Sequence, residues 1–251
     1  MSRAARQKHL SLIHIFHERL APRYQGLGPS QFVWDVRVEP EGIGVGGAVA
    51  RLMDNVRVLT IGTDMSVGKM TAGLEIERNA KARGVKTAFV ATGQVGIVIT
   101  GAGVPLDAVR LDYASGAIET ETCKYPESEL IVIEGQGSLL HPGSSATLPL
   151  LRGSCPTHLV LCHRAGMARL PRIPWIEVPP LRDVVRLFED VASACGTFGR
   201  PKVAGIALNT SHLDGAAASE AEAKVKDETG LPVTDPVRHG AGALVDAILG
   251  S

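Results

Sequence analysis

A phosphate-binding loop is predicted between a strand and a helix in the first third of the chain. The segment from Gly62 to Thr71 begins with a glycine and carries a second one, Gly68, directly before Lys69. Glycines let several backbone N–H groups approach an anion, while the lysine and the helix N-terminus add positive charge. We therefore predict that this segment binds the phosphates of a nucleotide-like ligand. The residues expected to bind the cofactor are Gly62, Thr63, Gly68, Lys69, Met70 and Thr71.

The spacing of this loop differs in two ways from the commonest phosphate-binding motif. Five residues, not four, separate Gly62 from Gly68, and the hydroxyl after the lysine comes one position late, at Thr71. A shift of one residue turns a helical side chain by about 100°. Whether Thr71 reaches a magnesium ion is therefore open. An ordinary strand-to-helix turn that contains a Gly-Lys pair is the alternative to a ligand site.

Acidic and imidazole side chains near the predicted strand ends are candidates for catalysis. Glu134 ends a buried strand, where a charge is costly unless it is paired or bound to metal, so we predict a magnesium ligand or general base. Asp64 could hold a water, orient an acceptor amine, or simply cap the helix. His141 and His163 could each remove a proton from an attacking ammonium, or could be ordinary loop histidines.

Polar residues after the second and third strands are candidates for substrate binding. Thr92 and Gln94 follow the second strand, and Gln136 lies two residues after Glu134. An amide such as that of Gln94 could donate to a substrate carboxylate or carbonyl. Hydrogen bonding within the loops is the alternative role for all three side chains.

The loop resembles that of the dethiobiotin synthetase and cobyrinic acid amide synthetase class of P-loop enzymes. Two further segments support the resemblance, namely residues 131–137, with Glu134, and residues 203–209, which end at Asn209. The resemblance implies that Glu134 helps to hold magnesium and that Asn209 contacts the nucleotide base. It also implies ATP as a cofactor and a mostly parallel sheet with ligands at its carboxyl edge.

Five motifs in order resemble one narrower P-loop family, formerly of unknown function, that includes a D-glutamate N-acetyltransferase. They are residues 62–71, 91–94, 134–138, 141–142 and 162–166, and the resemblance covers about residues 34–251. It implies transfer of an acetyl group from acetyl-CoA to the amine of a small acidic amino acid. Members usually carry a sizeable α/β domain before the P-loop domain. We therefore expect residues 1–53 to be a short leader or the remnant of such a domain, and residues 54–251 to be the P-loop domain.

Three functions follow from these residues and resemblances. The first is the N-acetyltransferase, in which Glu134 or His141 takes the proton and backbone N–H groups stabilise the oxyanion. The second is an ATP- and magnesium-dependent ligase that phosphorylates a substrate carboxylate, with Lys69 at the γ-phosphate and Glu134, with or without Thr71, at the metal. The third is a nucleotide-binding switch without catalysis. Because acetyl transfer needs no phosphoryl transfer, the displaced Thr71 is compatible with the first.

The elements that must hold these residues alternate between strands and helices. Apolar runs predict strands at residues 56–61, 87–91, 130–133, 158–162 and 203–208, and apolar spacing predicts helices at 69–82, 107–119, 181–196, 216–229 and 243–249. The clearest helix carries its apolar stripe at Leu181, Val184, Val185, Phe188, Val191, Ala192 and Cys195. This alternation predicts an α/β fold with a mostly parallel sheet and helices on both faces, a P-loop NTPase-like three-layer sandwich.

Bulk composition excludes several classes of protein. The 26 basic and 26 acidic residues of the chain balance, so no charge attracts nucleic acid. The cysteines have no paired short spacing, so we expect reduced thiols, mostly buried: Cys123, Cys155, Cys162 and Cys195. No apolar run approaches the roughly 20 residues of a membrane helix. We expect a cytoplasmic protein, a homo-oligomer, whose partner is a small amino acid substrate and not a membrane or nucleic acid.

Overall fold

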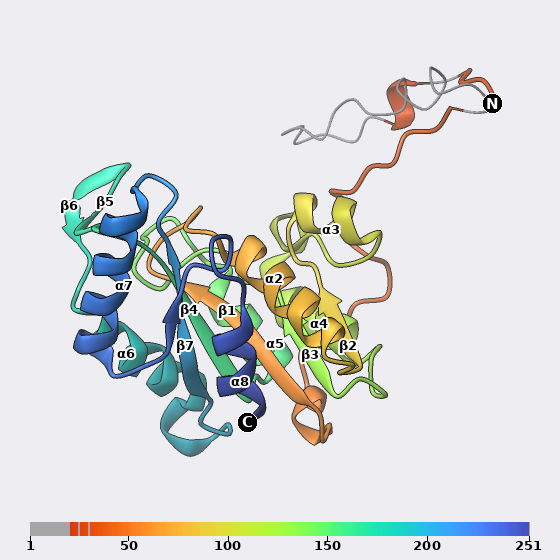
Figure 1. The fold of residues 1–251 in the computed structure, drawn as a ribbon. Coiled ribbons are helices and arrows are strands. Elements are labelled where there is room, and N and C mark those ends of the chain that lie inside the picture. Colours follow the sequence, from red (N-terminus) through yellow and green to blue (C-terminus); the bar gives the residue numbers. More distant parts are fainter. Residues whose placement is uncertain (1–20, 25, 30, 251) are drawn as a thin grey trace.

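The fold is a parallel sheet covered by helices on both faces. A computed structural model describes residues 21–250, with the exception of residues 25 and 30. Six strands form one parallel sheet in the order β2-β3-β1-β4-β7-β8 (Figure 1). The strands are β1 (Val56–Gly62), β2 (Thr87–Val90), β3 (Leu130–Ile133), β4 (His158–Arg164), β7 (Lys202–Asn209) and β8 (Val233–Thr234). The predicted P-loop NTPase-like sandwich is confirmed.

The helices divide between the two faces of the sheet. One face carries α2 (Lys69–Ala82) and α8 (Gly242–Leu249), which contact each other and the central strands. The other face carries a row of four helices, α4 (Leu111–Thr122), α5 (Thr147–Ser154), α6 (Leu181–Ser193) and α7 (Gly215–Thr229). Two apolar cores result, one on each side of the sheet.

The central strand shows why the sheet needs cover on both sides. Val58 belongs to the core under α2 and α8, whereas its neighbour Leu59 belongs to the core under the other four helices. Successive side chains of a strand point to opposite faces, so an apolar run such as residues 58–61 has one apolar side chain or more for each face. The apolar runs of the sequence thus specify a three-layer fold.

The parallel sheet brings the candidate residues to one edge. β1 lies between β3 and β4, and their carboxyl ends are Gly62, Ile133 and Arg164. The loops that follow them carry the phosphate loop, Glu134 and the segment after His163. In open α/β sheets ligands bind at this edge. A short antiparallel pair, β5 (Arg169–Leu170) and β6 (Ile173–Glu177), connects β4 to α6 and rises above the edge (Figure 1).

The structure corrects three details of the sequence prediction. The helix expected at residues 107–119 begins later, at Leu111, because Arg110 is extended and only a 3-10 turn precedes it. Two helices were missed, α3 (Gln94–Thr100) and α5, because both are short and contain glycine. The helix expected to reach residue 196 ends at Ser193, where Ala194 and Cys195 turn into the left-handed region. Cys195 is consequently exposed and not part of the apolar stripe.

Part of the segment expected to be a leader packs against the P-loop domain. The carboxylate of Glu119 on α4 accepts hydrogen bonds from the N–H groups of Gly47 and Val49, at 3.0 and 2.6 Å. Val36 and Ile43 pack against the two apolar cores. The segment from residue 36 onward is therefore integrated into the fold.

In the described part of the chain, every helix is too short or too polar to cross a bilayer. The described cysteines form no disulfide; Cys155 and Cys162 are buried, whereas Cys123 is half-buried.

Close contact between α4 and α5 gives a test of the packing. A Cβ at Gly153 would lie 2.3 Å from the carbonyl oxygen of Ser115 and 2.7 Å from Cβ of Ile118. We expect Gly153→Ala to lower the free energy of unfolding by about 1–3 kcal/mol, because the two helices must move apart. Urea unfolding followed by circular dichroism measures the loss.

The matched control is Gly215→Ala at the first residue of α7. An added Cβ there meets nothing within 4 Å. This variant should unfold within about 0.5 kcal/mol of the wild type. Equal stability of the two variants would contradict the close packing of α4 on α5.

Candidate functional site

The phosphate loop has the backbone of an anion site. Gly68, which precedes α2, has φ 107°, a conformation that favours glycine. A Cβ at Gly62 would lie 2.9 Å from Cγ2 of Val67 and 3.1 Å from Nζ of Lys69, so a larger residue would push into the loop. No side chain caps α2, and the first N–H groups of a helix have no intrahelical acceptor. These N–H groups are therefore free to bind an anion at the loop.

Lys69 places its charge inside the loop. Its side chain is buried, and Nζ donates to the carbonyl oxygen of Asp64 at 2.8 Å. Burial lowers the pKa of the ammonium, and Cys162, Asp64 and Glu134 partly offset the shift. A buried cation with one neutral acceptor is stabilised by any anion that enters the loop.

Glu134 is buried directly after β3, and its carboxylate accepts three hydrogen bonds. Its Oε2 accepts from the N–H groups of Thr92 at 2.9 Å and Gly93 at 3.1 Å, and Oε1 accepts from Nε2 of Gln136 at 3.1 Å. Burial raises the pKa of the carboxyl, and these donors and Lys69 act in the opposite direction. Glu134 therefore holds the loop after β2 in place. Its expected roles as base or magnesium ligand stay predictions.

Of the three residues expected to bind substrate, two lie beside Glu134 and the third, Gln94, does not. Thr92 is buried, and its hydroxyl donates to the carbonyl oxygen of Glu134 at 2.7 Å. Gln136 lies against Glu134, so these residues form one cluster beside the phosphate loop. Gln94 instead donates to Asp107 at 3.0 Å on the exposed side of the turn. That contact directs its amide away from Glu134.

A hydrogen bond joins His163 to the phosphate loop. Nδ1 of His163 lies 2.9 Å from Oγ1 of Thr63, and both residues are buried. Burial lowers the pKa of His163 to about 4, so its imidazole is neutral at pH 7. A neutral imidazole has one nitrogen that can accept a proton. The neighbouring Cys162 is unsuited to this role, because burial raises the pKa of its thiol to about 12.

Asp64 and His141 stabilise their own loops. Oδ1 of Asp64 accepts from the N–H group of Met65 at 2.7 Å, and Asp64 is buried. His141 is half-buried, and its Nδ1 accepts from the N–H group of Gly143 at 3.1 Å. Both contacts are local turns, which leave one carboxylate oxygen and one ring nitrogen without such a bond.

Asn209 borders the phosphate loop, and its expected contact with a nucleotide base stays a prediction. Nδ2 of Asn209 lies 3.9 Å from the position of a Cβ on Gly68. Its Oδ1 accepts from the N–H group of Ser211 at 3.1 Å. The following Thr210 donates its N–H to Asp235 at 3.0 Å, and Arg238 donates to Oγ1 of Thr210 at 2.8 Å. Asp235 and Arg238 could not be found from the sequence, because the β8 strand before them has only two residues and was not predicted.

Metal binding has no further support in the described residues. Thr71 is exposed on the first turn of α2, and Met70 beside it is half-buried. Among residues 21–250, with the two gaps stated above, no three His, Cys, Asp or Glu side chains are grouped as metal ligands would be.

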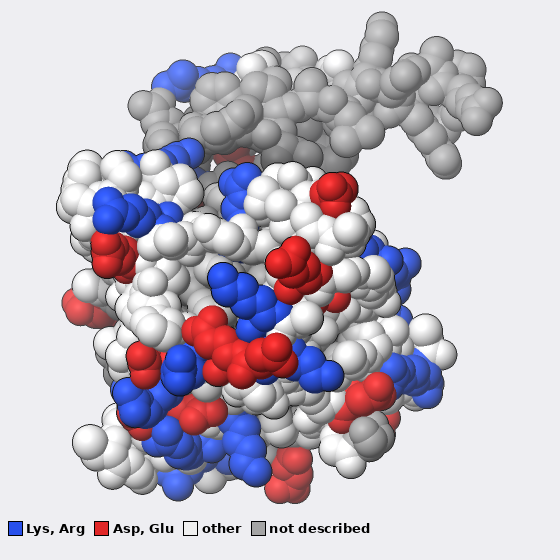
Figure 2. All heavy atoms as spheres, turned by 60° about the vertical axis from the view of Figure 1, so that its left-hand side comes forward, with Lys and Arg blue, Asp and Glu red and all other residues white. Residues whose placement is uncertain are grey.

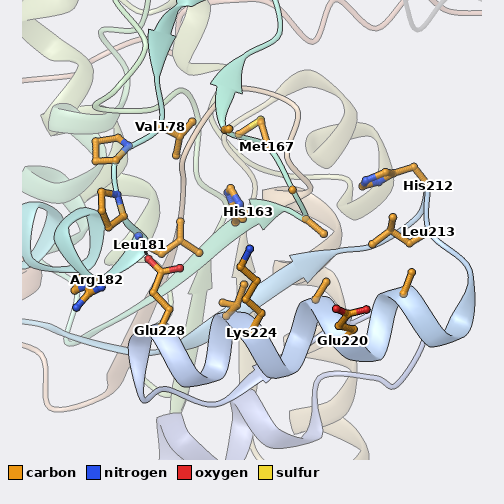
Figure 3. A pocket seen from close by; sticks show the side chains of 18 residues that line it. His163, Met167, Val178, Leu181, Arg182, His212, Leu213, Glu220, Lys224 and Glu228 are labelled. Carbon is orange, nitrogen blue, oxygen red and sulfur yellow. Dashed lines mark hydrogen bonds between the residues drawn. The ribbon is translucent and has the colours of Figure 1, made fainter.

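A groove opens beside His163 at the same edge of the sheet. It has a volume of about 810 Å³ and runs between α7 and the segment from Val178 to Arg182. Figure 3 shows His163 on one side of this groove and Lys224 of α7 opposite, with Nζ directed toward the imidazole. Most of the residues that line the groove are apolar, and they include Ala165, Met167, Val178, Leu181, Ala217 and Ala221.

The lysine of the groove was missed because its spacing is typical of a surface helix. Lys224 follows Glu220 and precedes Glu228 by four residues each, a pattern usually found in solvent-exposed salt bridges. Figure 2 shows the face of the molecule nearest this region, where acidic and basic side chains are interspersed. No feature of the sequence separates Lys224 from the other charges of this face.

Comparison with known proteins gives consistent results. Residues 44–245 match the model of a family described as a domain of unknown function (DUF1611_C) P-loop domain. A solved structure of a DUF1611 family protein from Anabaena variabilis ATCC 29413 is 54% identical, with a TM-score of 0.88 over 90% of this chain and 66% of that chain.

Two curated relatives have the name D-glutamate N-acetyltransferase. The protein from Tritonibacter scottomollicae is 39% identical over 234 residues, which are 85% of this chain and 69% of the relative. The protein from Pseudoalteromonas sp is 37% identical over 190 residues, 75% of this chain and 57% of the relative. The chain thus spans only part of the length of its relatives.

The buried imidazole predicts an acid-sensitive contribution to stability. The folded-state pKa of His163, about 4, lies below the ordinary value of 6.5, so protonation disfavours the folded state. Stability is unaffected above pH 6.5 and is lost as the pH falls from 6.5 toward 4, by at most about 3 kcal/mol. We expect His163→Gln to lose less stability than the wild type between pH 7 and pH 4.5.

Urea unfolding at both pH values measures this difference. His212→Gln, which replaces an exposed histidine of the same groove, is the control and should follow the wild type. An identical acid loss in His163→Gln and the wild type would show that His163 is not buried as a neutral base.

Proposed function

We propose that this chain, which belongs to the DUF1611 P-loop domain family, transfers an acetyl group from acetyl-CoA to the amine of a small acidic amino acid such as D-glutamate. The names of the two curated relatives support the reaction. The loop of residues 62–71 supports the donor, because acetyl-CoA carries phosphates that require an anion site.

The observation that carries the proposal is the state of the loop around Lys69. The ammonium is buried with one carbonyl acceptor, and α2 begins beside it without a side-chain cap. Both groups favour an anion. A diphosphate fits this donor set, because it offers several oxygens to the backbone N–H groups and to Nζ at once. Gly62 and Gly68 have no side chain that would block the backbone where the phosphate would approach.

Bound acetyl-CoA would supply a thioester carbonyl for attack by the amine. The chain would supply a proton acceptor, and His163 is the group best suited among those predicted. It lies next to the phosphate loop and lines the groove, and its imidazole is neutral at pH 7. Burial lowers its pKa to about 4, so it accepts a proton only as positive charge develops on the attacking nitrogen and not from a free ammonium. Glu134 is less suited, because three donors already occupy its carboxylate.

The proposed reaction balances without a metal or an oxidant. The acceptor loses one proton to water and attacks the thioester carbon as the neutral amine, and His163 accepts a proton from the nitrogen as the new bond forms. The carbon–nitrogen bond forms and the carbon–sulfur bond breaks. His163 passes the proton that it accepted to the sulfur, so the products are the N-acetyl amino acid, the free CoA thiol and the proton first lost to water.

One assay tests the function. The purified chain is incubated with D-glutamate and either acetyl-CoA or ATP with magnesium, and free thiol and phosphate are measured. We expect thiol release that depends on D-glutamate, without phosphate. Phosphate release that depends on D-glutamate, without thiol, would replace the proposal by the ligase. The absence of both products would contradict an enzymatic role for this chain on that substrate.

The phosphate loop gives a prediction for cofactor affinity. We expect Lys69→Ala to weaken CoA binding by about tenfold or more, because a hydrogen bond from a charged donor is lost. Isothermal titration calorimetry with CoA measures the change. Lys81→Ala, on the last turn of the same helix where Lys81 pairs with Glu77, should bind CoA like the wild type. Unchanged affinity in Lys69→Ala would remove the main support for the donor site.

A further inference from the structure

The groove beside His163 contains a charged side chain that has no hydrogen-bond or ion-pair partner among the described residues. Lys224 makes no hydrogen bond or ion pair within residues 21–250. Its neighbours at helical spacing do not neutralise it. Glu228 instead accepts the N–H group of Leu181 at 2.6 Å and so binds the start of α6. Glu220 lies one turn away, toward the His212 end of the groove (Figure 3).

The position of Lys224 directs its charge into the cavity. The side chain leaves α7 and extends toward His163, whereas Arg182 on the opposite wall points away from the cavity (Figure 3). His163 already binds Thr63 through Nδ1, so Nε2 is the ring nitrogen available to the groove. An ammonium and an imidazole therefore face each other across a groove whose lining is mostly apolar but also includes Glu220 and Glu228.

We propose that this groove is the acceptor site and that the Lys224 ammonium binds a carboxylate of an acidic amino acid. The proposal rests on the acetyl transfer proposed above. The Lys224 ammonium is exposed and has no hydrogen-bond or ion-pair partner within the described residues, so it is free to pair with an anion that enters the groove. The arm of acetyl-CoA between its phosphates and the thioester carries no charge, so it does not supply that anion. A dicarboxylic amino acid does.

The size and location of the groove fit a small substrate. Its volume of about 810 Å³ lies within the usual range for small-molecule sites, roughly 300–1,000 Å³. With the carboxylate on Lys224, the amine of the substrate can reach toward Nε2 of His163. That imidazole is one hydrogen bond from the phosphate loop, so donor and acceptor meet where β1 and β4 end.

Lys224→Met tests the proposal with a matched control. We expect this variant to raise the KM for D-glutamate about tenfold or more, with the KM for acetyl-CoA changed less than twofold. Lys226→Met removes the same charge from another exposed position two residues further along α7 that does not line the groove, and it should behave like the wild type. Lys224→Arg keeps the charge and should recover part of the affinity.

Direct binding separates this proposal from the proposed function. Calorimetric titration of D-glutamate into the chain reports acceptor binding whether or not thiol is released. If the wild type releases thiol and the Lys224→Met variant binds D-glutamate equally well, the acceptor site at Lys224 is contradicted and the proposed acetyl transfer is not. A wild type that binds D-glutamate through Lys224 but releases no thiol would contradict the acetyl transfer alone.

A second variant tests the groove independently of charge. Ala221 lines the groove and is half-buried, so Ala221→Trp should fill the cavity. We expect it to abolish D-glutamate binding while CoA binding, measured in the same way, is retained. CoA binding also verifies that the variant is folded. Normal D-glutamate binding in Ala221→Trp would place the acceptor elsewhere.

Discussion

The burial of the Lys69 ammonium at the sheet edge is the constraint on which the rest of the site depends. Burying a cation is costly unless a partner is present. Among the described residues, the only hydrogen-bond acceptor of Lys69 is the carbonyl oxygen of Asp64, while Glu134 contributes at longer range. The surrounding residues must be small enough to let the lysine side chain lie against the backbone. A Cβ at Gly135 would lie 3.1 Å from Cδ of Lys69 and 1.6 Å from the carbonyl oxygen of Thr60. Glycine at position 135 therefore serves both the sheet and the lysine.

Glu134 imposes a similar requirement on the loop after β2. Its carboxylate must be satisfied because it is buried, and the N–H groups of Thr92 and Gly93 do this. A Cβ at Gly96 would lie 2.3 Å from Oε2 of Glu134, so the first turn of α3 must also be bare. The carboxylate of Glu134 thus holds the loop after β2, and the carbonyl oxygen of Asp64 in the phosphate loop similarly holds the Lys69 ammonium. Two opposite buried charges, Lys69 at the start of α2 and Glu134 directly after β3, keep two loops of the carboxyl edge in fixed positions.

Much of this arrangement could be predicted from the sequence, and the limit lies where local pattern ends. The loop of residues 62–71, Glu134 and Asn209 were found because each follows an apolar strand, and parallel strands bring their ends together. The partners of Glu134 could not be found, since Thr92 lies 42 residues away and the contact depends on strand order. The helix α3 was missed because seven residues with an internal glycine give no helical period. Lys224 was missed because its spacing to Glu220 and Glu228 is that of a surface helix, and only the groove distinguishes it.

The strand register explains how two separate binding regions become one site. In the parallel pair of β1 and β4, Gly62 lies opposite Cys162. Thr63 directly follows Gly62, and His163 directly follows Cys162 in β4. The side chains of Thr63 and His163 are therefore neighbours, and a hydrogen bond of 2.9 Å joins them. A slip by one residue would turn one of these side chains to the other face of the sheet. Such a slip would also turn the apolar side chains of one strand into the core on the opposite face, where the packing does not match them. The apolar core thus fixes the register, and the register fixes the distance between the phosphate loop and the imidazole that faces the groove.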